Sequence, residues 1–322
     1  MGVSIVTPAY NAGRFLPYTI DSVLSQPVTD WEMVIVDDGS TDETASLVRS
    51  YASKDSRVRL ISQKNSGASR ARNRGLTEAD HRHQYVIFLD SDDIWEANTL
   101  EILLRAMENN PQAVGAHGTG RFIDEYGDLI REGELEESQR HRRGLIFDKH
   151  GKARIKEWPL EAPTTFAVLA HLSNIVPPGL AIWRKSAVEI AGGFDPSLIY
   201  CEDWDLFLRI SLLGDLAFID QPLVRYRQHA NSLTHDEMFM REQIERMRNR
   251  IIRMRGLNTD QRLLAVLSYC HWQRTYYQTR MQWAKDCWHR GQIIEATKQI
   301  RHAAQSGAKY TRWSLVAQSL TR

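Results

Sequence analysis

Acidic residues gather at three places where their spacing would allow chemistry: residues 37–38, 90–93 and 202–205. Asp90 and Asp92 are one residue apart, and in an extended turn two carboxylates at this spacing can both face a divalent cation such as Mg²⁺ or Mn²⁺. Asp203, with Glu202 beside it, could take a proton from a reacting hydroxyl group. A structural role is the alternative for each group, because acids also cap helices and fill turns.

Residues 65–73 combine small side chains with arginines, in the order Asn-Ser-Gly-Ala-Ser-Arg-Ala-Arg-Asn. The small residues would let backbone N–H groups approach a phosphate, and an arginine nearby can pair with a phosphate through two N–H groups. Neither Gly-x-Gly-x-x-Gly nor Gly-x₄-Gly-Lys occurs in the chain. This absence argues against a P-loop NTPase or a nicotinamide enzyme.

The elements that must position these residues alternate between strands and helices over residues 1–120. We expect strands at 3–6, 31–36, 58–61 and 85–89, and helices at 14–26, from Ser40 onward and at 68–77. Ser40 and Glu43 have the spacing of a capping box, which predicts that the second helix begins at Ser40. The alternation indicates an α/β protein with a mainly parallel sheet, in which ligands bind where the strands end.

The rest of the chain divides into three stretches. Charged runs between Asp124 and Lys156 predict a loop or a mobile insert. Strands at 179–183 and 217–219 and helices at 185–191 and 203–213 follow. From Glu237 onward we expect only amphipathic helices. We therefore expect one domain over residues 1–235, with halves at 1–120 and 121–235, and a helical C-terminal subdomain over 236–322.

The composition is ordinary for a globular protein and excludes some functions. The chain has 322 residues, with 41 Lys and Arg against 40 Asp and Glu, so we expect no nucleic-acid partner. Its apolar runs are far shorter than the ~20 residues that span a bilayer, and we find no signal peptide. The three cysteines match neither a disulfide framework nor a zinc site, which favours a reducing, cytoplasmic setting.

Short motifs in a fixed order give the strongest indication of function. They are Val6 to Asn11, Leu24 to Gln26, Val36 to Asp42, Ala71 to Gly75, Leu89 to Asp93, Gly192 to Asp195 and Glu202 to Leu206. In this order they resemble the family 2 glycosyltransferases over about residues 1–232. The resemblance implies a GT-A fold, a nucleotide-sugar donor, Mn²⁺ or Mg²⁺, and inversion at the anomeric carbon. We expect a UDP-linked donor and a hydroxyl of a glycan, lipid-linked or protein acceptor.

The resemblance also implies roles for individual residues. Those implied to bind the nucleotide are Pro8, Ala9, Tyr10, Asp37, Asp38, Arg72 and Asp90. Asp90 would lie at the ribose and Asp92 on the metal ion. His229 resembles a family histidine on a mobile loop that closes toward the diphosphate or the metal, although a surface histidine is the alternative. Asp203 matches the general base, and Glu202 would orient it or bind the acceptor.

Two other functions can be weighed against this one. A catalytically silent protein that only binds a nucleotide sugar would not need Asp92, Asp203 and His229 together. A signalling receiver domain would carry its acid pair after the first strand, whereas Asp37 and Asp38 follow the second. The glycosyltransferase is therefore the predicted function, with the silent binding protein as its alternative.

The C-terminal helices allow two interpretations each. Arginines between 241 and 255 lie among apolar residues, which is typical either of a membrane-surface helix or, more often, of a solvated face over a packed stripe. We therefore allow for a peripheral membrane contact, at the inner face of the membrane. Aromatic residues between 272 and 288 could form a sugar platform, but their helical spacing favours the core.

Overall fold

The structure is a computed structural model, and it describes residues 2–147, 153–229 and 237–320. The chain forms two compact units. The first comprises Met1–Arg142, Glu157–Leu169 and Ser173–Gln243, and the second comprises Arg143–Lys156, Ala170–Leu172 and Ile244–Arg322. The second unit therefore takes in residues 143–156 and 170–172, which the sequence placed with the first domain.

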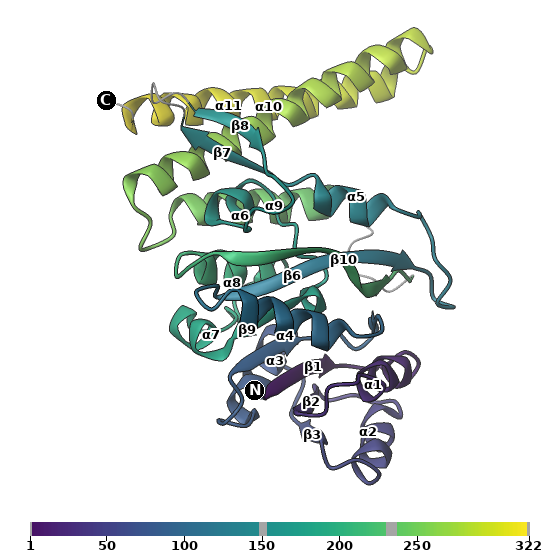
Figure 1. The fold of residues 1–322 in the computed structure, drawn as a ribbon. Coiled ribbons are helices and arrows are strands. Elements are labelled where there is room, and N and C mark those ends of the chain that lie inside the picture. The colour runs from purple at the N-terminus through teal and green to yellow at the C-terminus, as the bar shows by residue number, and fades with distance from the viewer. Residues whose placement is uncertain (1, 148–152, 230–236, 321–322) are drawn as a thin grey trace. The chain divides into compact units, whose positions relative to one another are not determined.

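An eight-stranded sheet forms the centre of the first unit, in the order β3-β2-β1-β4-β9-β6-β10-β5 (Figure 1). Its strands are β1 (Val3–Ala9), β2 (Trp31–Asp37), β3 (Val58–Ser62), β4 (Tyr85–Phe88), β5 (Ile94–Trp95), β6 (Gly115–Ile123), β9 (Ala181–Arg184) and β10 (Leu216–Arg227). Neighbours β1, β2, β3 and β4 pair in parallel, as do β6 and β10. Strand β9 is antiparallel to both of its neighbours. The predicted α/β class with a mainly parallel sheet is confirmed.

Helices join these strands and bury the sheet. They are α1 (Leu16–Leu24), α2 (Thr44–Ala52), α3 (Ala68–Glu78), α4 (Thr99–Asn109), α5 (Glu134–Arg140), α6 (Phe166–His171), α7 (Lys185–Ala191) and α8 (Glu202–Ser211), with a 3₁₀ turn at Pro178–Leu180. Every residue of β2 is buried, as expected for a strand with neighbours on both sides and helices packed on the sheet. Helix α3 lies so close to β1 that a Cβ on Gly75 would come within 2.3 Å of Val6 Cγ1.

Two local predictions are wrong. Helix α2 begins at Thr44 and not at Ser40, because the Ser40 hydroxyl accepts a hydrogen bond from the Asn11 N–H, on another segment, at 2.9 Å. The stretch from Asp124 to Lys156 is not simply a loop, since it contains α5, β7 (Arg143–Phe147) and β8 (Ala153–Glu157). Strands β7 and β8 pair as a small separate sheet. Residues 148–152 lie outside the described part of the chain.

The predicted helices from Glu237 onward are confirmed as α9 (Glu237–Ile252), α10 (Thr259–His289) and α11 (Ile293–Leu320). Helices α10 and α11 bury small residues such as Ala284, Cys287 and Ala303. The helical spacing of the large aromatics predicted that they belong to the core. This prediction is wrong for Trp283 and Trp288, which are 39% and 62% exposed. In the described residues no helix combines the length and the apolar character needed to cross a membrane.

Candidate active site

Acids from distant parts of the sequence meet where the parallel strands end. Strands β1, β2 and β4 run in the same direction, so their carboxyl ends lie at one edge of the sheet. Ala9 at the end of β1 pairs with Asp37 at the end of β2, and Asp90 follows β4 two residues after its end. This edge is where an open parallel sheet binds ligands.

Arg72 joins two of these acids. Its Nη2 donates a hydrogen bond to Asp90 Oδ1 at 2.6 Å, and its Nη1 donates to Glu202 Oε1 at 2.8 Å. The arginine side chain is only 6% exposed, and its guanidinium lies 5.2 Å from the centre of the Phe194 ring. The side chain therefore holds the end of β4 against the start of α8 through two ion pairs.

Asp203 has the electrostatic character that proton transfer requires. It lies in the first turn of α8, where its Oδ1 accepts a hydrogen bond from the N–H of Trp204 at 2.7 Å. Burial and the neighbouring Glu202 carboxylate raise the pKa of Asp203 to about 7, although Arg72 and the Trp204 hydrogen bond oppose the rise. A carboxylate with a pKa near neutrality is well matched to general base catalysis.

The two residues predicted to hold a metal ion are neighbours in the structure. His229 Nε2 lies 3.0 Å from Asp92 Oδ2, and the imidazole packs against the Phe15 ring with 4.9 Å between ring centres. These residues are separated by most of the domain in sequence. The rest of the predicted closing loop, residues 230–236, lies outside the described residues.

The donor set at Asp92 fits a metal ion that also binds a substrate phosphate. Carboxylate oxygen and imidazole nitrogen are both ligands for Mn²⁺, and Mg²⁺ is commonly held by one or two carboxylates with phosphates completing its shell. Within the described ranges no group of three or more His, Cys, Asp or Glu residues could hold an ion. Asp90 is less available than Asp92, because Arg72 already binds one of its oxygens.

Asp93 and Arg227 belong to the same region and were not predicted. Asp93 is fully buried, and its Oδ1 accepts a hydrogen bond from the Arg227 backbone N–H at 3.1 Å. Burial, then the charges of Asp92 and Asp90, raise the pKa of Asp93 well above its usual range. The Arg227 side chain donates from Nε to the carbonyl oxygen of Asp92 at 2.9 Å. The pair thus fixes the turn that presents Asp92, and Arg227 itself lies two residues before His229.

Asp37 and Asp38, at the carboxyl end of β2, have a different environment. The Asp38 carboxylate accepts hydrogen bonds from Gln63 Nε2 at 2.7 Å and from the N–H groups of Ser66 and Gly67 at 2.8 Å each. Asp37 Oδ1 accepts from the Ser40 N–H at 3.0 Å. Gly39, which lies between Asp38 and Ser40, adopts a φ of +77°, and a Cβ there would lie 2.8 Å from the Asn65 backbone nitrogen. These contacts fix the turn after β2 against residues 63–67.

The remaining predicted nucleotide residues lie at the end of β1. Ala9 is buried, Pro8 is half-buried, and Tyr10 is 53% exposed at the surface. A hydrogen bond from the Asp38 N–H to the Ala9 carbonyl oxygen, 2.8 Å long, joins this strand end to the turn after β2. Every residue predicted for the site therefore lies at or next to the carboxyl edge of the sheet.

The chain is similar to known glycosyltransferases in sequence and in fold. A model of the family described as "Glycosyl transferase family 2" matches residues 4–187. A chondroitin synthase of Escherichia coli is 29% identical over 221 residues, which are 68% of this chain and 28% of that protein. A putative teichuronic acid biosynthesis glycosyltransferase of Bacillus subtilis is 46% identical over 106 residues, 33% of this chain and 41% of that protein. The chain thus spans less than half the length of these relatives.

The solved structures show the same fold. The structure of S. aureus TarS 1–349 aligns with a TM-score of 0.62 and 17% identity, covering 97% of this chain and 89% of that one. The same protein in complex with UDP-GlcNAc aligns with a TM-score of 0.60 over 83% of this chain and 71% of that one, again at 17% identity. The predicted GT-A fold is confirmed. Because the family model covers more than half of the sequence, the chain belongs to glycosyl transferase family 2.

Proposed function

We propose that this glycosyltransferase moves a sugar from a UDP-linked donor to a hydroxyl group with inversion at the anomeric carbon, and that Asp203 is the general base. The observation that carries the proposal is the position of Asp203 in the first turn of α8, beside a Glu202 that Arg72 joins to Asp90. Burial and Glu202 raise the pKa of Asp203 to about 7 in this position. Attack opposite the leaving group requires the acceptor hydroxyl to lose its proton, and a base with this pKa can take it at neutral pH.

The leaving group is the nucleoside diphosphate, whose oxygens gain negative charge as the sugar departs. We propose that Asp92 and His229 together hold Mn²⁺ or Mg²⁺ with the donor diphosphate. Such an ion supplies positive charge that stabilises the leaving diphosphate. Asp93 and Arg227 hold the turn that presents Asp92, so they position a ligand without touching the substrate.

The nucleotide is proposed to bind along the ends of β1 and β2. Tyr10 follows β1 and offers an exposed ring there. Asp90 follows β4, which neighbours β1 in the sheet, and is proposed to contact the ribose. Asp38 uses its carboxylate for three hydrogen bonds to residues 63–67, so its first role is to shape this site. UDP is the favoured nucleotide because TarS, which shares the fold, binds UDP and UDP-GlcNAc.

The acceptor class is proposed from the relatives alone. Those named above, and a hyaluronan synthase of Pasteurella multocida that is 27% identical over 221 residues, carry names of glycan-producing enzymes. That match covers 68% of this chain and 20% of the synthase. We therefore propose a glycan, free or lipid-linked, as the first acceptor class to test.

Product analysis tests the proposed reaction. The full chain would be incubated with UDP-, GDP- and dTDP-sugars, Mn²⁺ and a panel of oligosaccharide acceptors, and the new linkage read by NMR. We expect transfer from a UDP-sugar with the opposite anomeric configuration in the product. Retention of configuration would exclude Asp203 as the base for an inverting displacement. Donor binding without transfer to any acceptor would instead favour the silent binding protein.

The tip of the α10–α11 hairpin is the part of the chain that we propose for a peripheral membrane contact. Trp288, Ile293 and Ile294 are 62%, 59% and 88% exposed there, and tryptophan favours the interface between lipid and water. Co-sedimentation with anionic vesicles tests the contact. We expect Ile294→Ser with Trp288→Ser to reduce binding, and unchanged sedimentation of this double variant would contradict the proposal.

A further inference from the structure

A pocket of about 280 Å³ lies at the carboxyl end of β6, within the first unit. Three segments line it: residues 120–122 at the end of β6, residues 129–133, and residues 135–136 at the start of α5. Strand β9 is antiparallel to both β4 and β6, so β4 and β6 run in the same direction. The pocket therefore lies at the same edge of the sheet as Asp90 and Asp92, which follow β4.

Two aromatic rings connect this pocket to the acids. Phe122 lines the pocket, and its ring centre lies 5.7 Å from that of Tyr226 on β10. Burial raises the pKa of Tyr226, and the negative charges of Asp93, Asp90 and Asp92 add to the rise. Tyr226 is therefore a neighbour both of the pocket wall and of the acids.

One part of the pocket wall is apolar. Phe122 is half-buried, Leu135 is buried, and Leu129 is 51% exposed. The Ile130 N–H donates to the Phe122 carbonyl oxygen at 3.0 Å, which holds the preceding Leu129 in place. Binding pockets are commonly lined by such side chains, with a few polar groups among them. The C–H face of a sugar ring can pack against a wall of this kind.

The charged residues of the lining balance one another. They are Arg121, Arg131, Glu132 and Glu136. Arg121 and Glu136 form an ion pair with each other, which leaves one cation and one anion for a ligand. An anionic ligand would meet the Glu132 carboxylate, and a cationic ligand would meet the Arg131 guanidinium, so the lining favours a neutral ligand. A hydroxyl group suits both side chains, because it accepts from an N–H group and donates to a carboxylate.

Arg131 and Glu132 have polar groups that the other described residues do not use. The Arg131 guanidinium lies 4.0 Å from the centre of the Phe122 ring. Its ion pair with Glu134 is 3.7 Å long, which exceeds hydrogen-bond length. Glu132 is exposed, and within the described ranges its side chain has no ion pair or hydrogen bond. The aromatic ring thus holds the guanidinium while its N–H groups remain able to donate.

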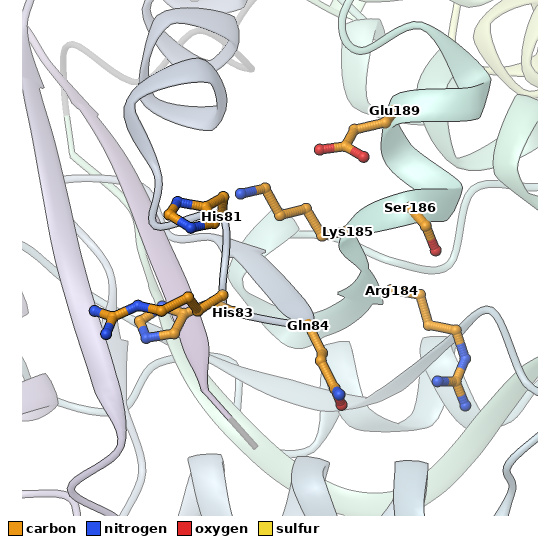
Figure 2. Close-up of a pocket in the computed structure, with 8 residues that line it drawn as sticks. His81, His83, Gln84, Arg184, Lys185, Ser186 and Glu189 are labelled. Atoms are coloured by element: carbon orange, nitrogen blue, oxygen red, sulfur yellow. The ribbon is translucent and has the colours of Figure 1, made fainter.

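A larger pocket, of about 560 Å³ at the amino end of β4, has cations that do not converge (Figure 2). Arg184 donates to the Ala113 carbonyl oxygen at 2.7 Å. The buried Lys185 donates to the Asp80 carbonyl oxygen at 3.0 Å. Figure 2 shows the charged ends of these two side chains pointing to opposite sides. One small ligand could not contact both, so the pocket at β6 is the stronger candidate for a binding site.

We propose that the pocket at β6 binds a neutral sugar ring of the acceptor glycan, next to the ring that carries the reacting hydroxyl. The proposal rests on the glycan acceptor of the proposed function. Neither Asp92 nor Asp203 lines the pocket, so the bound ring is not the reacting one. Arg131 and Glu132 bind its hydroxyl groups, and the apolar wall packs against its C–H face. An acceptor therefore needs at least two sugar units to use the whole site.

Saturation-transfer NMR of the full chain tests the pocket without measuring activity. The probes are cellobiose, lactose and N,N′-diacetylchitobiose, with glucuronate as the charged comparison and with UDP and Mn²⁺ present throughout. We expect a neutral disaccharide to bind, and glucuronate to bind about ten-fold more weakly. The proposal is overturned if none of the three disaccharides binds, or if glucuronate binds as tightly. Binding of a disaccharide without transfer in any assay would contradict the proposed function and not the sugar site.

Variants of exposed residues show whether binding occurs in this pocket. Arg131→Ala removes N–H donors and should weaken disaccharide binding about ten-fold. Glu132→Gln keeps an acceptor oxygen but removes the charge, so disaccharide affinity should change less than about two-fold while glucuronate binds more tightly. Arg105→Ala is the matched control, because Arg105 is an exposed arginine paired with a nearby acid, as Arg131 is, but does not line the pocket. Equal disaccharide affinity in Arg131→Ala and Arg105→Ala would overturn the proposal.

Discussion

The aspartates at the carboxyl end of β2 and those that follow β4 have different surroundings. After β2, the carboxylates of Asp37 and Asp38 accept hydrogen bonds from N–H groups of their own turn and of residues 63–67. After β4, Asp90 and Asp93 face other acids, and their pKa values are raised, in each case mainly by burial. The first arrangement stabilises the local fold. In the second, carboxylates repel one another, and a positively charged ligand would reduce this repulsion.

At this edge of the sheet, one group of acids therefore maintains the backbone shape and the other takes part in the reaction. The acids of the first group accept N–H hydrogen bonds that keep a backbone turn in place. Acids gathered around Arg72 share one cation among Asp90, Glu202 and the nearby Asp203. Variants of the first group should therefore change stability, and variants of the second should change catalysis.

The largest effect is expected at Asp203. Asp203→Asn keeps the shape of the side chain but removes the proton acceptor, so turnover should fall by ~10² or more while UDP-sugar affinity changes by only a few-fold. Steady-state kinetics and calorimetry measure the two quantities. Normal turnover would move the base to Glu202, and the variant Glu202→Gln is the direct check.

A large effect on stability is expected at Asp38. Asp38→Ala removes three hydrogen bonds to a carboxylate and should lower the free energy of unfolding by about 1–3 kcal/mol. Asp38→Asn keeps one acceptor oxygen and should lose less. Urea unfolding of both variants, with the exposed Glu108→Ala as control, measures the difference. If Asp38→Ala is as stable as the control, the proposed division between the two aspartate groups fails.

We expect divalent ions to affect UDP binding through the acids after β4 and not through Asp37 and Asp38. In Mn²⁺ we expect Asp92→Ala to weaken UDP binding by about ten-fold or more, because the diphosphate loses an ion that Asp92 holds. In chelator the variant and the unmodified chain should bind UDP alike. Calorimetry with and without Mn²⁺ decides this, with the exposed Asp128→Ala as control. Equal affinity of the unmodified chain in both conditions would contradict the metal role.

The smallest effect is a shift of the pH profile. Asp203 must be ionised to act as a base, so the rate should rise with pH through its pKa of about 7. Glu202→Gln removes a negative charge that raises this pKa, and the rising limb should move down by about 0.5–1 pH unit. The pH dependence of kcat/KM measures the midpoint. A midpoint that moves upward would mean that Glu202 does not act on Asp203 through its charge.

The strand pattern could be predicted from the sequence because burial leaves a strong signal. The run from Trp31 to Val36 is apolar throughout except for Glu32, and β2 covers it with one more residue. Helix α5 gave no such signal, since only Leu135 and Gln139 are buried in it. The start of α2 failed for another reason, because the Ser40 hydroxyl binds a distant backbone group.

The site could be predicted in part. Motif order singled out Asp92 and Asp203, and the resemblance to the family singled out His229. The structure brings Asp92 and His229 together. The role of Arg72 as a bridge to Glu202 could not be foreseen, because it depends on where α8 begins relative to β4. Asp93 and Arg227 were missed for a similar reason, since only the pairing of β10 with β6 and β5 carries Arg227 to Asp93.

The two ion pairs of Arg72 make the donor side and the acceptor side of the site thermodynamically linked. The Arg72 guanidinium opposes the rise in the pKa values of Asp90 and Asp203, so an anion that draws this group toward the donor would leave Asp203 more basic. Linkage is reciprocal, so ionisation of Asp203 must weaken the binding of that anion by the same factor. Through the buried Arg72 side chain, the proton affinity of Asp203 and the binding of the donor therefore depend on each other.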